Sequence, residues 1–395
     1  MLISAINISN YDDHRFVVNT AGGRNILVDG NTIELLDILR NERSIEEACT
    51  SFNKSLNVSL NLDEFIALVN QNLGGYGILL NEDPIAKKTS GQSYLKARIN
   101  IIPPNVAGKL SAPFTYFFKP ILFYTLLSFM LMFSVFTIKY FFVEHLKVIT
   151  PNFSLLSLLI CMTMLVHELG HIAACRRYNI RHGAIGFGIY AVIPVAFADI
   201  SNIWQASRNK RIMANLGGIF CEYLYAFALL LIYSVTSNPT FLLAHVIIAS
   251  KAILELNPFI RLDGYWVLSD LTSTPNLLAK ARGALKLAFK TNQDNKSAGM
   301  KNLFSKHTFL ITYGVMNYVV MLLYIILIWS TYKQAILSFP ETLILLVQRA
   351  WHLDVSLGDF KWAYLMVLLF YYLLMQYSLN YIFMPIFKKA KEYLK

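Results

Sequence analysis

The sequence predicts an α-helical polytopic membrane protein with about six transmembrane helices, a re-entrant β-hairpin and a small N-terminal α/β domain of winged-helix-like type. Hydrophobic residues make up 55% of the 395 residues, and charged residues only 15%. A soluble protein of this length does not need so much apolar surface. In addition, several uncharged runs reach or approach the roughly 20 residues with which a helix crosses a bilayer.

The formal net charge of the chain is +11. Nucleic-acid binding is one explanation of such a charge, but most of the basic residues lie in loops beside apolar runs, as they do in the cytoplasmic loops of membrane proteins. Because no nucleic-acid-binding motif accompanies them, we expect the lipid bilayer as a partner and no nucleic acid. The four cysteines form no CxxC pair, which favours a reducing compartment without a disulfide framework.

Residues 1–85 differ in composition from the rest and predict a small soluble α/β domain. An Ala-Gly-Gly turn separates two short apolar runs, as in a pair of strands, and Ser44 and Glu47 have the spacing of a capping box that opens a helix. The expected elements are strands at 16–18 and 26–28, helices at 32–39, from 45 onward and at 62–73, and a return strand at 77–80. Residues 86–112 are expected to be a polar, proline-bearing linker.

Six apolar runs are long enough to be expected spans. They lie at about 118–143, 152–175, 211–235, 239–257, 308–331 and 362–386. The region 184–200 is apolar but broken by glycine and proline, so a re-entrant hairpin lining a cavity is expected there. The run at 335–349 is consistent with either an interfacial helix or a further span.

Basic residues set the expected orientation, because cytoplasmic loops carry an excess of Lys and Arg. They follow the second expected span, precede the third and end the chain at 388–395. Seven more fall in residues 271–306, which we interpret as a basic cytoplasmic loop, followed by C-terminal transmembrane helices and a basic tail at 307–395. With six spans, both termini and the N-terminal domain lie on the cytoplasmic face.

The motif His167-Glu168-Leu169-Gly170-His171 lies near the end of the second expected span. Residues four apart on a helix point in nearly the same direction, so both imidazoles can bind one zinc ion, and Glu168 can take a proton from a water at the metal. The alternative is a chance match or a polar cluster that stabilises helix packing. Two histidines and a carboxylate are expensive in an apolar span unless they bind metal, pair or face water, which favours the metal site.

A catalytic zinc usually has three protein ligands, and the best candidate for the third is Asp263. Pro258 is expected to break the fourth span, and Gly264 permits an irregular turn, so the carboxylate can swing onto the metal. Taken alone, a Leu-Asp-Gly tripeptide is equally consistent with a helix-ending turn.

At these residues the sequence resembles the site-2 protease family of intramembrane metalloproteases, over about residues 113–270. The resemblance includes Gly186, Gly188 and Pro194 and the stretch 211–218. These three residues, with Asn257 and Glu222, are the candidate substrate-binding residues. The resemblance implies that His167, His171 and Asp263 bind zinc, that Glu168 is the general base, and that the hairpin after the HExxH helix holds the substrate in extended form.

Two further acidic positions bear on this resemblance. Glu255 occupies the position of the Asn in the family pattern NxxPxxxxDG, which leaves the role of that Asn open, and Asn257 is the candidate to replace it as a polar donor. Glu222 lies within the third expected span, where it can line the cavity, contact substrate or pair with a neighbour.

The N-terminal domain resembles the PqqD-like peptide-recognition domain in its order of strands and helices. The combination with a site-2-protease-like core is similar to the peptide zinc metalloproteases of bacteriocin and peptide-maturation clusters. It implies a bacterial cytoplasmic (inner) membrane protein, a peptide or membrane-tethered substrate, and peptide-maturation or export proteins as partners. The alternative for residues 1–85 is a regulatory or packing domain.

Three functions are compatible with these features. The first is a zinc metalloendopeptidase, the second a non-enzymatic membrane protein for peptide binding, export or immunity, and the third a metal transporter. A binding or transport role needs no water-activating glutamate. A transporter would distribute its acidic and histidine residues along several spans, whereas here they gather in one constellation, so the sequence favours the protease.

Overall fold

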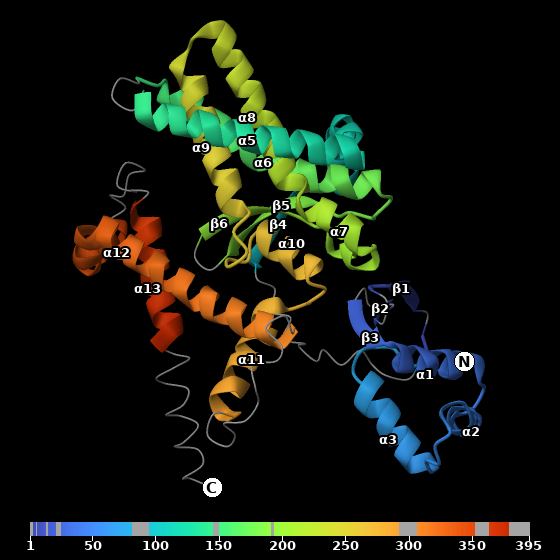
Figure 1. Ribbon diagram of the computed structural model, residues 1–395. Helices are drawn as coiled ribbons and strands as arrows, with labels where there is room; N and C mark the ends of the chain where they lie inside the picture. The colour runs from blue at the N-terminus through green and yellow to red at the C-terminus, as the bar shows by residue number, and fades with distance from the viewer. Residues whose placement is uncertain are drawn as a thin grey trace. The chain divides into compact units, whose positions relative to one another are not determined.

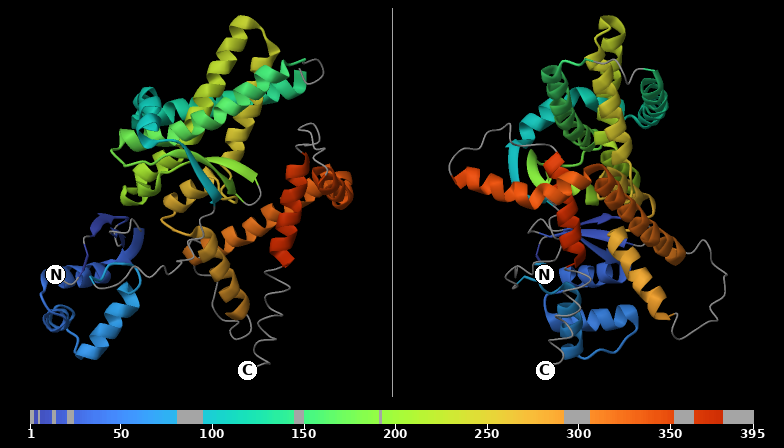
Figure 2. Two further views of the ribbon diagram at one scale, coloured as in Figure 1. Left: turned by 180° about the vertical axis from the view of Figure 1, so that it is seen from behind. Right: turned by 90° about the vertical axis from the view of Figure 1, so that its left-hand side faces the viewer.

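The structure is a computed structural model, shown in Figures 1 and 2. It describes residues 3–4, 6–12, 15–20, 25–80, 95–144, 150–190, 193–291, 306–351 and 363–378. The chain divides into two units, which are described separately. The first unit contains residues 1–92, 100–185 and 197–275, and the second contains residues 93–99, 186–196 and 276–395.

The N-terminal domain is a three-stranded antiparallel sheet followed by three helices. Its elements are β1 (Asn7–Asn10), β2 (Arg15–Asn19), β3 (Asn25–Asp29), α1 (Gly30–Asn41), α2 (Ile45–Leu56) and α3 (Leu62–Leu73). The central strand β2 places Val18 opposite Ile8 of β1 and Ile26 of β3. Leu36, Leu39 and Phe65 form part of the buried core between the helices and the sheet.

Two expectations for this domain are corrected. The return strand expected at 77–80 is reduced to one isolated bridge between Ile3 and Leu79. The Ser44 side chain does accept from the backbone of Glu47, but the Glu47 carboxylate accepts from Arg43 rather than from Ser44, so the predicted capping box is only half formed. The turn expected at 21–23 lies outside the described residues.

The segment expected as a linker is folded over much of its length. It forms β4 (Leu95–Ile102) and α4 (Pro104–Ser111), and the 3-10 helix η1 (Ala112–Phe118) follows. The sequence Leu-Lys-Ala-Arg-Ile-Asn-Ile alternates apolar and polar residues with the period of a strand, and Pro104 at the start of α4 has the backbone angle that a helix needs. The segment expected as a polar, proline-bearing linker therefore contains a strand and a helix that the sequence analysis did not predict.

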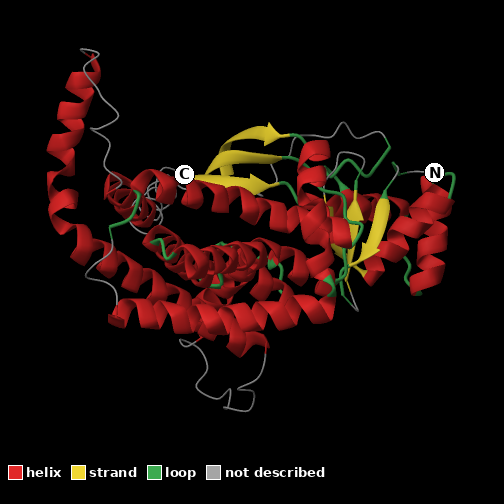
Figure 3. Cartoon of the chain, turned by 90° about the horizontal axis from the view of Figure 1, so that it is seen from above, coloured by secondary structure: helices red, strands yellow, loops and turns green. Residues whose placement is uncertain are grey.

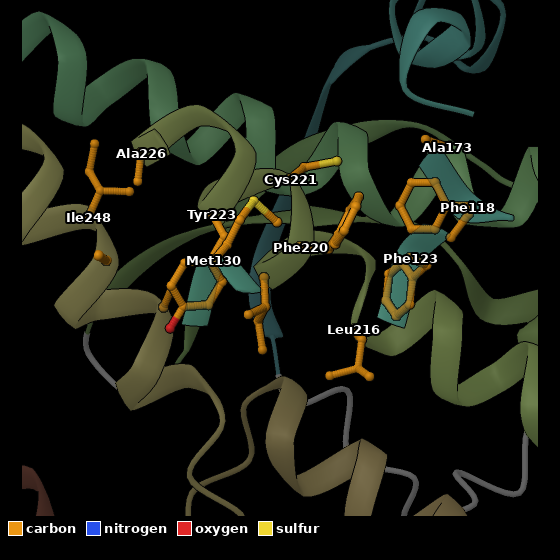
Figure 4. Close-up of a cluster of buried hydrophobic side chains, with 14 of the residues drawn as sticks. Phe118, Phe123, Met130, Ala173, Leu216, Phe220, Cys221, Tyr223, Ala226 and Ile248 are labelled. Atoms are coloured by element: carbon orange, nitrogen blue, oxygen red, sulfur yellow. The ribbon is translucent and has the colours of Figure 1, made fainter. Parts of the chain in front are cut away.

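Four apolar helices form the main part of the first unit. They are α5 (Pro120–Glu144), α6 (Phe153–Arg177), α8 (Gly217–Thr236), which the short α7 (Arg208–Asn215) precedes, and α9 (Pro239–Glu255). Aromatic residues pack η1, α5 and α8 together, as Figure 4 shows, and the ring centroids of Phe123 and Phe220 are 4.6 Å apart. All four cysteines are free.

The α6 and α8 helices make a backbone-to-backbone contact at Gly170 and Gly217. A Cβ atom on either glycine would overlap the carbonyl group of the other. Small residues allow helices in membranes to approach this closely, because no side chain separates their backbones. The contact lies one residue before His171 and fixes the distance between the two helices at that point.

The hairpin expected at 184–200 is present as β5 (Ile185–Tyr190) and β6 (Ile193–Ala198). Its base is closed by backbone hydrogen bonds from Gly183 to Asp199 and from Asp199 to Ala184. The sequence did not predict that β4 joins the hairpin, which makes a second three-stranded sheet of order β4-β5-β6; strands are yellow in Figure 3.

The second unit contains α11 (Leu277–Thr291), α12 (Lys306–Trp351) and α13 (Ala363–Ser378). The first of these helices lies within the segment expected as a basic loop, which is therefore partly helical. The run at 335–349 continues α12 past a non-helical residue at Tyr332 and includes Pro340. The basic tail lies outside the described residues.

Within the described residues, four helical segments are long and apolar enough to cross a membrane. They are Pro120–Thr137, Phe153–Arg177, Arg208–Thr236 and Lys306–Leu345. The other two expected spans correspond to α9, with 17 residues, and α13, described over 16 residues. The structure thus agrees with a polytopic membrane protein, and the number of six spans stays a prediction.

Candidate metal centre

The HExxH motif lies in the second half of α6, where apolar helices surround it. His167, Glu168 and His171 are exposed to only 9%, 7% and 6%. The Nε2 atoms of the two histidines lie 3.1 Å apart, as expected for side chains one helical turn apart that point to a common centre. Nitrogen atoms this close repel unless a proton or a metal ion lies between them.

Asp263 is brought to these histidines by the break after α9. Its Oδ2 atom lies 3.2 Å from His167 Nε2 and 3.4 Å from His171 Nε2. It is the first residue of α10 (Asp263–Leu271). Figure 1 labels this helix, and it also labels α6 and α8. Burial alone would raise the pKa of Asp263, but attraction to His171 and His167 outweighs it, and the pKa lies below its ordinary value. A metal ion bound between the histidines would favour the ionised carboxylate in the same way, because a carboxylate binds metal in its deprotonated form.

The glycine after Asp263 is required by packing. A Cβ atom on Gly264 would overlap the backbone of Leu256, just after the end of α9. The other end of α10 is held by Asp270, whose carboxylate accepts from Arg211 Nε at 2.7 Å and from Asn215 Nδ2 at 2.9 Å. The helix that carries the aspartate is thus fixed at both ends.

The second ring nitrogen of His171 is also engaged. Its Nδ1 atom lies 2.8 Å from the carbonyl oxygen of Ala214, near the end of α7. Since a carbonyl oxygen only accepts, Nδ1 carries a proton, and in the neutral ring Nε2 then has a free lone pair that faces His167 and Asp263. A partner of this kind commonly orients a histidine that binds metal.

Two observations test whether a metal ion fits between these residues. Asp263 Oδ2 is buried without a hydrogen-bond partner among the described residues, which is costly unless a cation satisfies it. A Cβ atom on Gly218 would lie 2.5 Å from His167 Nε2 and 2.6 Å from His171 Nε2, so a glycine keeps the space beside these nitrogens open. Two imidazoles and one carboxylate are a donor set of catalytic zinc sites, and the residues fit this metal.

The other residues predicted for the site are spread over β5, β6, α8 and the turn after α9. Gly186 and Gly188 are buried in β5, whereas Pro194 in β6 is exposed. Asn257 Oδ1 accepts from the backbone of Phe259 at 2.9 Å, so it supports the turn after α9. Glu222 is fully buried on α8 and lies 3.4 Å from His167.

Two further residues of this region, Glu255 and Lys251, were not predicted for the site. Glu255, considered only for its place in the family pattern, lies 3.3 Å from His167 Nδ1. Lys251 was missed entirely, although a lone lysine in the apolar run of α9 is itself a signal of a buried partner. His245, by contrast, hydrogen-bonds Thr137 and the carbonyl of Ala226 within the packed helices.

The profile of Peptidase family M50, the site-2 protease family, matches residues 155–355. This is half of the chain, and it includes both histidines, Glu168 and Asp263. The chain belongs to Peptidase family M50.

This M50 chain is also 30% identical, over 109 residues, to a Bacillus subtilis (strain 168) protein described as "Putative peptide zinc metalloprotease protein YydH". The match covers 27% of the M50 chain and 43% of the YydH protein, so it spans less than half of that relative. No solved structure matches the chain.

Proposed function

We propose that this protein is a membrane-embedded zinc metalloprotease that hydrolyses peptide bonds. The observation that carries the proposal is the convergence of His167, His171 and Asp263, whose ligand atoms all lie within 4.8 Å of one another. These residues come from two helices, and Glu168 lies between the two histidines on α6. Family membership and the zinc metalloprotease description of the relative support the same function.

The side chains have separate roles in this proposal. His167 and His171, through Nε2, and Asp263, through Oδ2, would hold the zinc ion, which supplies a Lewis acid and makes water acidic enough to lose a proton near neutral pH. Glu168 takes the proton of the attacking water and then delivers it to the departing amine. The Ala214 carbonyl keeps His171 in the tautomer that leaves Nε2 free.

The substrate is proposed to lie extended along the sheet β4-β5-β6. Ile185, the first residue of β5, packs with Leu169 and Ile172 of α6, the helix that carries Glu168, in one buried cluster. Strand addition satisfies the backbone of a substrate and presents a peptide bond in extended form. Gly186, Gly188 and Pro194 are the proposed contact positions.

The N-terminal domain is proposed to recruit a peptide in the manner of a PqqD-like domain. Its sheet has β1 and β3 as outer strands, and an outer strand offers unpaired backbone groups to an extended peptide. The substrate would then be a ribosomally made peptide that is matured, or a membrane-tethered protein, with maturation or export proteins as further partners. The proposed location is the bacterial inner membrane, with both termini in the cytoplasm.

The second candidate function is a non-enzymatic membrane protein for peptide binding, export or immunity. The N-terminal domain is compatible with it, but such a protein has no use for a buried glutamate between two histidines that face an aspartate. Mass spectrometry of peptides from cells with the wild type and with Glu168→Ala distinguishes the two. A cleavage product that depends on Glu168 supports the protease, and identical peptides in both strains support the second function.

A further inference from the structure

Each ring nitrogen of His167 faces different groups. Nε2 points to the proposed metal ligands His171 and Asp263, and Nδ1 lies 3.4 Å from Glu222 Oε2 and 3.3 Å from Glu255 Oε2. Nδ1 and both of these carboxylate oxygens are buried without another hydrogen-bond partner among the described residues. The three atoms are therefore available to one another.

The two carboxylates come from different helices and are joined by one lysine. Glu222 is fully buried on α8, and Glu255 is the last residue of α9. Lys251, one turn earlier on α9, places Nζ 2.5 Å from Oε1 of Glu222 and 2.5 Å from Oε1 of Glu255. One oxygen of each carboxylate thus binds the lysine, and the other faces His167.

The charges of this cluster do not cancel. One carboxylate is enough to neutralise one lysine. Apolar helices that merely pack together would bury no more than that single pair, because each buried charge is costly. With both carboxylates ionised, the cluster carries one net negative charge directed at Nδ1. A carboxylate that accepts from the outer N–H of a metal-binding histidine orients the ring and raises the basicity of the inner nitrogen.

His167, Glu222 and Glu255 also offer ligand atoms within 4.8 Å of one another, which is close enough for a second metal ion to be considered. Lys251 argues against that assignment. Its ammonium group already provides the positive charge that a metal ion would provide, and it binds both carboxylates. A second ion would also require His167 to bind metal through both nitrogens, without any proton on the ring.

We propose that Glu222 and Glu255, bridged by Lys251, accept the Nδ1 proton of His167 and thereby hold its Nε2 toward the metal. We call these three residues the carboxylate clamp. They are positioning residues that touch neither metal nor substrate. His171 has only the neutral Ala214 carbonyl at the equivalent nitrogen, so the clamp makes His167 the stronger donor of the pair. The inference rests on the zinc site of the proposed function.

The clamp is tested by the zinc affinity of the purified protein, residues 1–395, which is measured by competition with a chromophoric chelator. In Glu222→Gln/Glu255→Gln both carboxylates become neutral while their shapes are kept. We expect zinc binding to weaken about 10- to 100-fold, as for other outer partners of metal-binding histidines. The visible spectrum of the cobalt-substituted variant should shift as well, because the ring of His167 is no longer held. The matched control is Glu341→Gln, an exposed glutamate on α12, which should bind zinc like the wild type.

A charge-balanced variant separates this role from ordinary helix packing. Lys251→Met/Glu255→Gln removes both ion pairs but keeps one carboxylate, Glu222, and the same net charge at Nδ1. The clamp predicts zinc affinity near that of the wild type, whereas a purely structural role of the ion pairs predicts loss. Wild-type affinity and spectrum in Glu222→Gln/Glu255→Gln, or equal losses in both double variants, would overturn the inference.

If the double glutamine variant does not fold, the single Glu222→Gln and Glu255→Gln variants replace it, and unchanged zinc affinity in both would equally overturn the clamp. The readout is independent of proteolysis. A wild type that binds zinc but cleaves nothing contradicts the proposed function alone. A wild type that cleaves, with zinc affinity that ignores both carboxylates, contradicts the clamp alone.

Discussion

Gly218→Ala is the smallest change that tests where the metal site lies. The added methyl carbon would lie 2.5 Å from His167 Nε2 and 2.6 Å from His171 Nε2. Non-bonded heavy atoms rest at about 3.5 Å or more, so each ring nitrogen must retreat by roughly 1 Å. Because the ligand distances of a metal site tolerate only about 0.2 Å, we expect zinc affinity to fall by about 100-fold or more, beyond the upper range for outer-partner changes.

The assay is chelator competition on purified protein, with thermal unfolding measured in excess chelator. The second measurement shows whether the variant folds without metal. Gly283→Ala is the matched control, since a Cβ atom there meets nothing within 4 Å. If Gly218→Ala bound zinc as tightly as the wild type, the ion would not lie between the two Nε2 atoms, and the site described above would be wrong.

Three further predictions concern the same site. Glu168→Gln should retain zinc, measured by elemental analysis, while cleavage of a membrane-tethered or leader-bearing peptide in liposomes falls by about 10²- to 10⁴-fold, the range for a lost general base; wild-type turnover would refute its role. The wild type should contain about one zinc per chain, and His167→Ala, His171→Ala or Asp263→Ala should each lower that content; full retention would remove the residue from the ligand set. Gly264→Ala should weaken zinc binding in the same chelator assay, because the methyl group would overlap the backbone of Leu256 and displace Asp263; an unchanged affinity would show that α10 tolerates the shift.

Local rules were sufficient to predict part of the site. The spacing of His167 and His171 on an apolar helix places both rings on one side, because it follows from helix geometry alone. Asp263 lies 92 residues later along the chain than His171, and its candidacy came from the break at Pro258 and from the family resemblance. The structure brings these three together.

The groups around His167 depend on tertiary packing, which periodicity does not describe. Glu222 and Lys251 lie on two different helices, and only the packing of α8 against α9 brings the lysine to Glu222, which faces the ring of His167. The backbone partner of His171 is also invisible in the sequence, because any residue at position 214 offers a carbonyl.

The fold likewise contains elements that local sequence patterns predict and others that depend on long-range contacts. Strongly periodic helices such as α3 were predicted to the residue, whereas β1 was missed because its sequence, Asn-Ile-Ser-Asn, has too little apolar character to stand out. β4 does alternate, but its polar surroundings and prolines favoured a linker. Its pairing with the distant hairpin 184–200 is a long-range contact that no local pattern specifies.

The contact of Gly170 with Gly217 has a mechanical consequence for the metal centre. Gly170 lies between the two histidines in the chain, and Gly217 precedes Gly218, the glycine that faces them. The backbones of α6 and α8 therefore set both the distance between these helices and the space beside the histidine nitrogens. No side chain lies between the two backbones at this point, so a bulkier residue at either position would push α6 and α8 apart and move His167 away from Gly218 and Glu222 on α8. The space between the histidine nitrogens of the candidate centre and α8 therefore depends on main-chain atoms, which cannot relieve a clash by changing rotamer.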